Sequence, residues 1–173
     1  MRGFETARLR MRPLDAGDEA LYCGLYTDAE TMRYICEPLS TSRARSSFRR
    51  AIRTPRPGDG PLLFAMHEKG TTRSVGICAM VQLIKSAARA EVGVMLQSDA
   101  RGRGYAREGL AGMVGSVFTT FAVQTIWVEC AALNPIVERM VSSIGFVLDD
   151  ATSIGEGPLL QRTWSVQRLS YGE

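Results

Sequence analysis

The sequence has few residues of the kinds that build metal centres and disulfide frameworks. Its 173 residues include one histidine, His67, and four widely spaced cysteines, Cys23, Cys36, Cys78 and Cys130. This scarcity argues against a bound metal and against a disulfide-stapled secreted domain. The thiols fit the reduced cysteines of a cytoplasmic protein, and we expect Cys78 and Cys130 to face the core. We expect His67 at an exposed strand end, which makes it a poor candidate base.

Long apolar runs and a large net charge are also missing. No apolar segment approaches the length that spans a bilayer, and the first residues contain no apolar signal segment. The formal net charge of +3 is too mild to indicate nucleic-acid binding by itself. We therefore expect a cytoplasmic protein that requires neither a membrane nor a nucleic acid.

Hydrophobic periodicity predicts a layered domain of helices and strands. We expect a mixed central sheet flanked by helices, in the α/β (or α+β) class, as a single domain over residues 1–173. Turn formers at 54–61 indicate a loop rather than a domain boundary. The expected helices lie near 15–29, 40–53, 104–121 and 135–144, and the strands near 7–12, 62–68, 73–84, 89–97, 125–131, 146–149 and 159–168.

The strongest indication of chemistry is a glycine-rich run between an alternating strand and an amphipathic helix. It consists of Arg101, Gly102, Arg103, Gly104, Tyr105 and Ala106. The glycines clear side chains from the helix start, where unpaired N–H groups and the helix dipole favour a phosphate. No Walker loop is present, and a dinucleotide fingerprint would need a third glycine where Arg107 stands. A plain glycine-rich turn is the alternative explanation.

The spacing Arg101-x-x-Gly104-x-Ala106 resembles the central Gln/Arg-x-x-Gly-x-Gly/Ala motif of the GNAT superfamily of N-acyltransferases. The resemblance implies that this run binds the pyrophosphate of coenzyme A. It also implies that backbone amides around Met95 and Leu96, on the preceding strand, hold the pantetheine arm and polarise the thioester carbonyl of acetyl-CoA.

The helix after the run carries Gly109, Gly112 and Gly115. Each glycine costs a helix roughly 1 kcal/mol relative to alanine. A face of small residues therefore predicts close approach to the sheet or to the cofactor, with sequence drift as the alternative.

A second strand and helix extend the resemblance. Asn134 and Pro135 are a favourable N-cap and first helical residue, and this structural role suffices for both. In GNAT proteins an asparagine at this place begins a helix beside the cofactor, so the resemblance implies that Asn134 also contacts coenzyme A. Many members have a tyrosine general acid where Val141 stands, so the usual acid is missing.

The segment from Glu5 to Leu14, with Thr31 to Tyr34 after it, resembles the opening of RimJ/RimL-type acetyltransferases. That branch acetylates N-termini of ribosomal proteins and includes enzymes that act on small amines, so the resemblance implies an amine acceptor. An arginine-rich stretch then forms either a solvated helix face or a surface for an acidic substrate, a coenzyme A phosphate or ribosomal RNA. Its members are Arg43, Arg45, Arg49, Arg50, Arg53 and Arg56.

Acetyl transfer to an amine needs a base, because most amines are protonated at neutral pH. Glu91 is the first candidate, since it lies on the strand before the glycine-rich run and several GNAT members place a catalytic Glu at the matching point. Its alternative is an ordinary strand carboxylate, paired with Arg89 or with an arginine of a neighbouring strand. Glu129 on the next strand is the second candidate. No cysteine has a nucleophile's setting, so we expect direct transfer in a ternary complex.

Two functions stay open at this point. The first is an acetyl-CoA-dependent N-acetyltransferase, a monomer or homodimer, that acts on a peptide N-terminus or a small-molecule amine. The second is a non-catalytic sensor or partner protein that binds coenzyme A through a degenerate site. Loops near 34–38 and 149–157 are expected to border the acceptor site. Their acidic residues, which suit a cationic amine, are Glu37, Asp149, Asp150 and Glu156.

Overall fold

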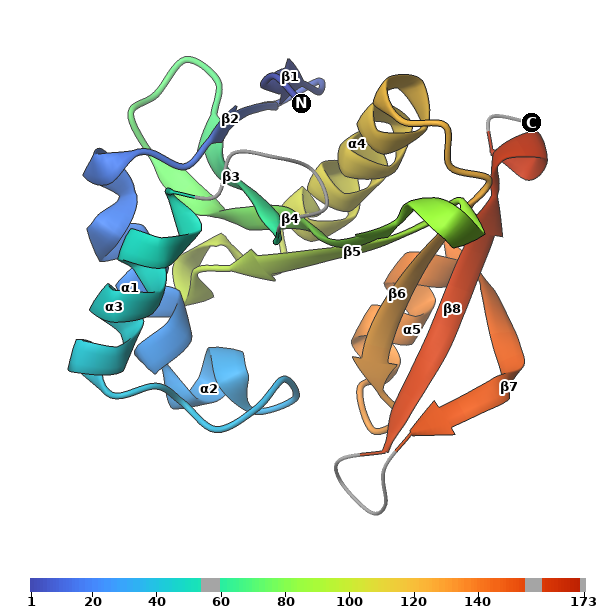
Figure 1. The fold of residues 1–173 in the computed structure, drawn as a ribbon. Coiled ribbons are helices and arrows are strands. Elements are labelled where there is room, and N and C mark those ends of the chain that lie inside the picture. The colour runs from blue at the N-terminus through green and yellow to red at the C-terminus, as the bar shows by residue number, and fades with distance from the viewer. Residues whose placement is uncertain (54–59, 155–159, 172–173) are drawn as a thin grey trace.

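The computed structural model describes residues 1–53, 60–154 and 160–171, and its centre is one mixed sheet (Figure 1). Within these residues the sheet has eight strands in the order β1-β2-β3-β4-β5-β6-β8-β7. The strands are β1 (Phe4–Glu5), β2 (Leu9–Pro13), β3 (Leu62–Glu68), β4 (Ser74–Ile84), β5 (Arg89–Leu96), β6 (Thr125–Ala131), β7 (Val147–Ile154) and β8 (Gln161–Gln167). The predicted fold class is confirmed, although β1 was missed and β7 is longer than expected.

Helices cover both faces of the sheet (Figure 1). They are α1 (Glu19–Thr27), α2 (Ala29–Met32), α3 (Thr41–Ala51), α4 (Tyr105–Thr120) and α5 (Pro135–Ser142). The helix predicted near 15–29 is broken at Asp28, which adopts an extended backbone and accepts a hydrogen bond from the Thr31 N–H at 2.7 Å. Asp28 therefore ends α1 and caps α2.

Two apolar clusters lie on opposite faces of the sheet, because side chains alternate along each strand. The main core joins β-strand residues such as Phe64 and Val92 to one side of α4 and to Val141 of α5. The second core joins Ala65 and Ile77 of the other face to α1 and α3. The sheet thus separates α4 and α5 from α1 and α3.

The sheet opens between β5 and β6, and this opening positions the site. The two strands are parallel and pair only from Arg89↔Thr125 to Glu91↔Trp127. Beyond Glu91, β5 continues beside β4 alone, while β6 continues beside β8. Opposite this point β4 has a register shift between Met80 and Gln82. The later half of β5 therefore has one unpaired edge.

Two of the three glycines of α4 are explained by close contact with β3 and with the β1–β2 turn. A Cβ atom on Gly109 would lie 2.4 Å from the Cε atom of Met66, and one on Gly112 would lie 2.6 Å from the Cγ2 atom of Thr6. The predicted close approach is therefore confirmed, with β3 and the β1–β2 turn as the contacted segments.

Candidate functional site

The loop from Arg101 to Ala106, termed the 101–106 loop, leaves a row of backbone amides open. Gly102 and Gly104 have φ values of +74° and +79°, a region in which residues with a side chain are strained. Gly104 is the N-cap of α4 and offers no side-chain acceptor. In the part of the chain that the structure describes, the N–H groups from Gly102 to Arg107 find no acceptor. Such a helix start favours a phosphate.

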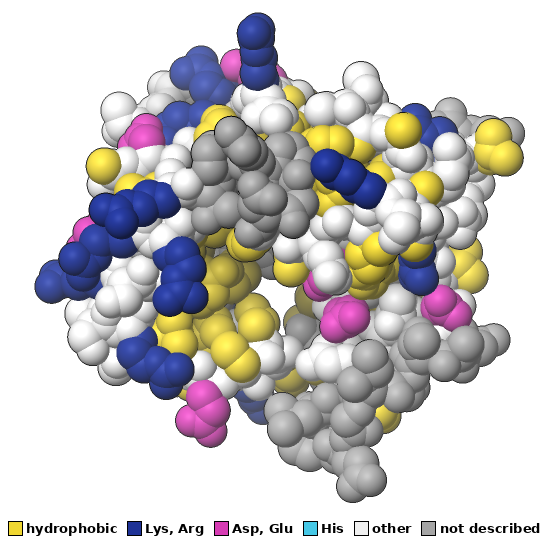
Figure 2. Space-filling model, in the orientation of Figure 1, with side chains coloured by type: hydrophobic (Ala, Val, Ile, Leu, Met, Phe, Trp, Pro, Cys, Tyr) yellow, Lys and Arg dark blue, Asp and Glu magenta, His cyan; other side chains and the backbone are white. Residues whose placement is uncertain are grey.

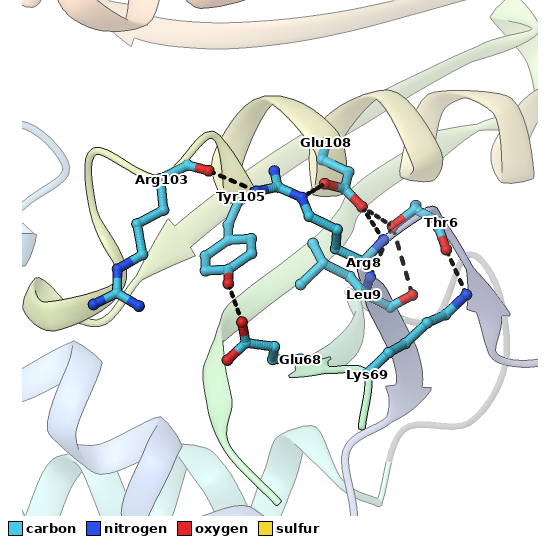
Figure 3. Close-up of polar contacts among 8 residues, drawn as sticks. All are labelled: Thr6, Arg8, Leu9, Glu68, Lys69, Arg103, Tyr105 and Glu108. Carbon is cyan, nitrogen blue, oxygen red and sulfur yellow. Dashed lines mark hydrogen bonds and ion pairs between the residues drawn. The ribbon is translucent and has the colours of Figure 1, made fainter. Parts of the chain in front are cut away.

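A hydrogen-bonded cluster supports this loop from behind (Figure 3). Glu108, in the first turn of α4, accepts hydrogen bonds from the Thr6 hydroxyl at 2.6 Å, the Arg8 N–H at 2.7 Å and the Arg8 Nε at 2.7 Å. Partial burial opposes ionisation of Glu108, but these hydrogen bonds outweigh it and lower its pKa. Arg8 also donates to the carbonyl of Arg103 at 3.0 Å. The cluster ties the start of α4 to the β1–β2 turn.

The side chains of the loop point in different directions. Tyr105 is buried, and its hydroxyl donates to Glu68 across the core, so its side chain is structural (Figure 3). The Arg101 guanidinium donates to the Thr31 hydroxyl at 2.7 Å and so joins the loop to α2. Arg103 is exposed and points away from the Arg8–Glu108 cluster (Figure 3).

The backbone of β5 presents alternate residues to its open edge. A Cβ atom on Gly76 would lie 2.1 Å from the Met95 carbonyl oxygen, so the polar backbone groups of Met95 face β4. In an antiparallel pair successive residues turn these groups to opposite edges. The N–H groups of Val94 and Leu96 are therefore directed to the unpaired edge, whereas the Met95 side chain packs beside the second core.

Glu91 lies where β5 and β6 separate, on the face covered by α1 and α3. Its neighbours Ala90 and Val92 are in the main core, so alternation turns Glu91 to the other face. Partial burial, with a smaller contribution from Glu129, raises the pKa of Glu91 to about 7. Within the described residues it has no ion-pair partner, and the Arg89 guanidinium lies 5.0 Å from the centre of a Trp127 ring instead. The suggested ion pair between Arg89 and Glu91 is therefore not formed.

The start of α5, after β6, is capped by a side chain, whereas the start of α4, after β5, is not. The Oδ1 atom of Asn134 accepts a hydrogen bond from the Val137 N–H at 3.4 Å, which confirms the predicted cap of α5. Arg107 donates to the Ser143 hydroxyl at 3.0 Å and thereby joins the start of α4 to the end of α5. Val141 is only 1% exposed and belongs to the main core, so this position supplies no acid.

The remaining candidate bases and nucleophiles are buried to different extents. His67 was predicted to be exposed, which is wrong: its Nε2 atom is buried without a partner in the described part of the chain, and burial lowers its pKa. Cys78 and Cys130 are buried as predicted, and burial raises the pKa of Cys130 to about 11. The described residues contain no metal-binding group of His, Cys, Asp and Glu side chains. None of their helices is both long and apolar enough to cross a bilayer.

Sequence reasoning missed Glu108 as the support of the loop. Its partners Thr6 and Arg8 lie about a hundred positions away in the chain, so no local pattern shows the contact. The acidic residues predicted to border the acceptor site are only partly described: Glu156 and the side chain of Asp150 lie outside the described residues, as does Arg56.

Comparison with known protein families shows to which family the chain belongs. Residues 8–147 match the family described as "Acetyltransferase (GNAT) domain". The chain belongs to this family. No curated protein matches the sequence.

Solved GNAT structures superpose on nearly the whole chain. Spermidine N-acetyltransferase from Vibrio cholerae, in complex with CoA and spermine, has a TM-score of 0.83 at 18% identity and covers 96% of this chain and 99% of its own. The microcin C7 self-immunity acetyltransferase MccE, with acetyl-CoA and AMP, has a TM-score of 0.77 at 13% identity, covering 93% of each chain. RimL, the ribosomal L7/L12 α-N-protein acetyltransferase, has a TM-score of 0.76 at 14% identity, covering 94% of this chain and 95% of its own. The TM-scores and coverages show a shared fold at low sequence identity.

Proposed function

We propose that the protein is an N-acetyltransferase that moves the acetyl group of acetyl-CoA directly to a primary amine. The observation that carries the proposal is the arrangement along β5. Glu91, half-buried with a pKa near neutrality, stands where β5 and β6 separate, and the 101–106 loop with its open amides follows the same strand. Membership of the GNAT family supports this assignment.

The chain offers backbone groups rather than a charged cage for coenzyme A. We assign the pyrophosphate to the open amides of the 101–106 loop, with Arg103 as the exposed cation beside them. Arg101, Tyr105 and Ala106 contribute through the backbone, since the side chains of Arg101 and Tyr105 are engaged elsewhere.

Two further segments complete this assignment. The N–H of Leu96 is directed to the open edge of β5, where the pantetheine arm would lie, and Met95 lines the neighbouring face with its side chain. The Oδ1 atom of Asn134 is engaged in its cap, so its amide NH2 group is the part that would contact coenzyme A.

The chemistry assigned to the chain is proton transfer and positioning. Acetyl-CoA supplies an activated acyl group: the new N–C bond forms as the C–S bond breaks, and the thiolate leaves. Glu91 takes the proton that the ammonium group must lose, directly or through a water molecule, and its pKa near 7 suits a base working at neutral pH. Holding the amine beside the acyl group supplies much of the remaining acceleration. Because thiolate is a stable leaving group, the apolar Val141 is compatible with turnover.

Release of free thiol from acetyl-CoA, measured with a panel of amines, tests this function. The wild-type rate should rise with pH through about 7, since only ionised Glu91 accepts a proton. Glu91→Gln should lower the rate by about 100-fold or more and abolish this pH dependence. Its affinity for acetyl-CoA should be unchanged. An unchanged rate and profile in Glu91→Gln would remove Glu91 from the mechanism.

The second candidate function is a non-catalytic protein that binds coenzyme A. The burial of Val141 at the usual place of the acid favours this alternative. It predicts micromolar binding of acetyl-CoA together with no thiol release from any amine in the panel. Turnover of a single amine above the Glu91→Gln background would contradict it.

The first strands of the chain bear on its branch of the family, its location and its acceptor. On the resemblance of its first strands we place the protein in the RimJ/RimL-type branch, as a cytoplasmic monomer or homodimer. The acceptor is a protein N-terminus or a small-molecule amine. The structural neighbours hold ligands of opposite charge, spermine in one and AMP in another, so the fold leaves the choice of acceptor to the residues around the site.

A further inference from the structure

The hairpin of β3 and β4 holds the 101–106 loop on both sides of its glycines. Before the loop, the Arg73 guanidinium donates to the carbonyl oxygen of Asp99 at 3.0 Å and to its carboxylate at 2.9 Å. Within the loop, the Tyr105 hydroxyl donates to the carboxylate of Glu68. Both glycines of the loop therefore lie between two attachments to one hairpin.

The two attachments are joined to each other and to the β1–β2 turn. The Nη1 atom of Arg73 lies 3.8 Å from the Oε2 atom of Glu68, and the Glu68 N–H donates to the Arg73 carbonyl at 3.0 Å. The next residue, Lys69, donates its N–H to the carbonyl of Arg8 at 2.8 Å, and the Arg8 guanidinium donates to the carbonyl of Arg103. The hairpin thus connects three hydrogen-bonded supports of the loop.

The loop depends on these supports because its packing is sparse at the first glycine. Apart from its chain neighbours, a Cβ atom on Gly102 would meet no described atom within 4 Å. Glycine has more conformational freedom to lose than any other residue, and fixing the backbone of one residue costs roughly 1–2 kcal/mol. A loop that is already fixed when the cofactor arrives avoids this cost on binding and so binds more tightly.

We propose that Glu68 and Arg73 are positioning residues for coenzyme A, which hold the amides from Gly102 to Arg107 in the arrangement that binds the pyrophosphate. Figure 3 shows Glu68 at the far end of the Tyr105 side chain from the loop backbone, so Glu68 acts through Tyr105. The Arg73 and Glu68 side chains are 27% and 28% exposed, so solvent screens their contacts only in part. This inference rests on the proposed binding of coenzyme A and names the distant residues that set its affinity.

Acetyl donors with and without a pyrophosphate test the proposal. Tyr105→Phe removes only the hydroxyl, and Arg73→Met keeps the length of the side chain without its donors. Each should lower kcat/KM for acetyl-CoA about five- to tenfold through KM, with kcat at saturation and the KM for the amine unchanged. The rate with S-acetylpantetheine, which has no pyrophosphate, should be unchanged. Arg73→Lys, which keeps a charged donor, should restore part of the affinity for acetyl-CoA.

Loss of a positive charge by itself also weakens the long-range attraction of an anionic cofactor. Arg49→Met is the matched control, because it removes one charge from α3, on the side of the molecule where Lys and Arg side chains gather (Figure 2). The Nε atom of Arg49 donates at 3.3 Å to the carbonyl of Arg45 in its own helix and not to the hairpin. Arg49→Met should bind acetyl-CoA as the wild type does, whereas Tyr105→Phe, which changes no charge, should bind it more weakly.

Two results would overturn the inference: wild-type affinity for acetyl-CoA in both Tyr105→Phe and Arg73→Met, or an equal loss of rate with acetyl-CoA and with S-acetylpantetheine. If the wild type binds coenzyme A and acetylates no amine, the proposed transfer fails separately. Calorimetry with coenzyme A then decides the inference without turnover. Weaker binding in the two variants than in Arg49→Met supports the positioning role, and equal binding in all three contradicts it.

Discussion

The two strand–loop–helix units, β5 with α4 and β6 with α5, run parallel but finish their loops in opposite ways. The helix α4 begins at a glycine with no side-chain cap and leaves its first amides open. The helix α5 begins at Asn134, whose side chain satisfies one amide, and at Pro135, which has no N–H to satisfy. A helix start without a side-chain cap is free to bind an anion, so we propose that the first unit binds coenzyme A and that the second supports it.

The start of α4 is also held by more side-chain hydrogen bonds than the start of α5. Both helices carry a glutamate in the first turn. Glu108 of α4 accepts three close hydrogen bonds from Thr6 and Arg8, whereas Glu138 of α5 accepts one from Arg162 at 2.9 Å. The open loop is therefore held rigidly by distant parts of the chain, as preorganised binding requires.

The largest expected effect, on the affinity for acetyl-CoA, comes from placing a negative charge at the start of α4. Gly104→Glu places a carboxylate at the N-cap, where it competes with a bound phosphate and adds strain at a φ of +79°. We expect acetyl-CoA affinity to fall about 100-fold, a loss of about 2.7 kcal/mol. Gly104→Gln is the matched control, since glutamine has the size of glutamate and the same strain at this backbone but carries no charge. Calorimetry measures both, and equal affinities for the two variants would contradict the role of the loop.

The second prediction removes the rigid support. Glu108→Gln should destabilise the protein by roughly 1–2 kcal/mol at pH 7, after allowance for solvent screening at half-exposed Arg8. Because folding lowers the pKa of Glu108, this contribution is present at neutral pH and is lost as pH falls through the lowered pKa. The difference from wild type in urea unfolding should therefore shrink in acid. Glu138→Gln should cost less, and a cost equal to that of Glu108→Gln would end the contrast between the units.

The third prediction concerns removal of the side-chain cap of α5. Asn134→Ala should destabilise the protein by about 1 kcal/mol through loss of the cap, and should weaken acetyl-CoA binding a few-fold. Asn134→Ser keeps a capping oxygen but lacks the amide NH2 group. If Asn134→Ser restores stability without restoring affinity, the contact with coenzyme A is separate from the cap. Restoration of both would assign Asn134 a structural role alone.

The smallest effect is expected where the two units influence each other. Glu129 on β6 contributes to the raised pKa of Glu91 on β5. Glu129→Gln should therefore lower the pKa of Glu91, leave the rate at high pH unchanged and increase it below pH 7. We expect an increase of about threefold near pH 6, which corresponds to half a pKa unit. A pH–rate profile that coincides with wild type would show that Glu129 does not act on the base.

The sequence predicted the elements of this fold well, because its apolar periods and caps are local signals. The strand 62–68 and the start of α5 at Asn134 are found where expected. The glycines at 102 and 104 likewise indicate an open helix start, and both have the positive φ values that such a loop requires. These features depend on neighbouring residues, so the order of residues along the chain is enough to predict them.

What the sequence did not show depends on contacts between distant segments. The Glu108 cluster joins residues about a hundred positions apart, and the direction of the Arg101 side chain is set by Thr31 of α2. The burial of the His67 Nε2 atom likewise follows from packing rather than from its place at a strand end. The opening between β5 and β6 is a property of the sheet, so only the structure shows that Glu91 stands at its edge.

Backbone amide shifts on titration with coenzyme A show directly whether the 101–106 loop binds the cofactor. In ¹⁵N-labelled protein we expect the largest changes at the amides from Gly102 to Arg107 and at Leu96, with small changes at residues 136–138 at the start of α5. Saturable shifts confined to the 101–106 loop and the open edge of β5 would support the contrast between the two units. Equal shifts at both helix starts, or none at the 101–106 loop, would contradict it.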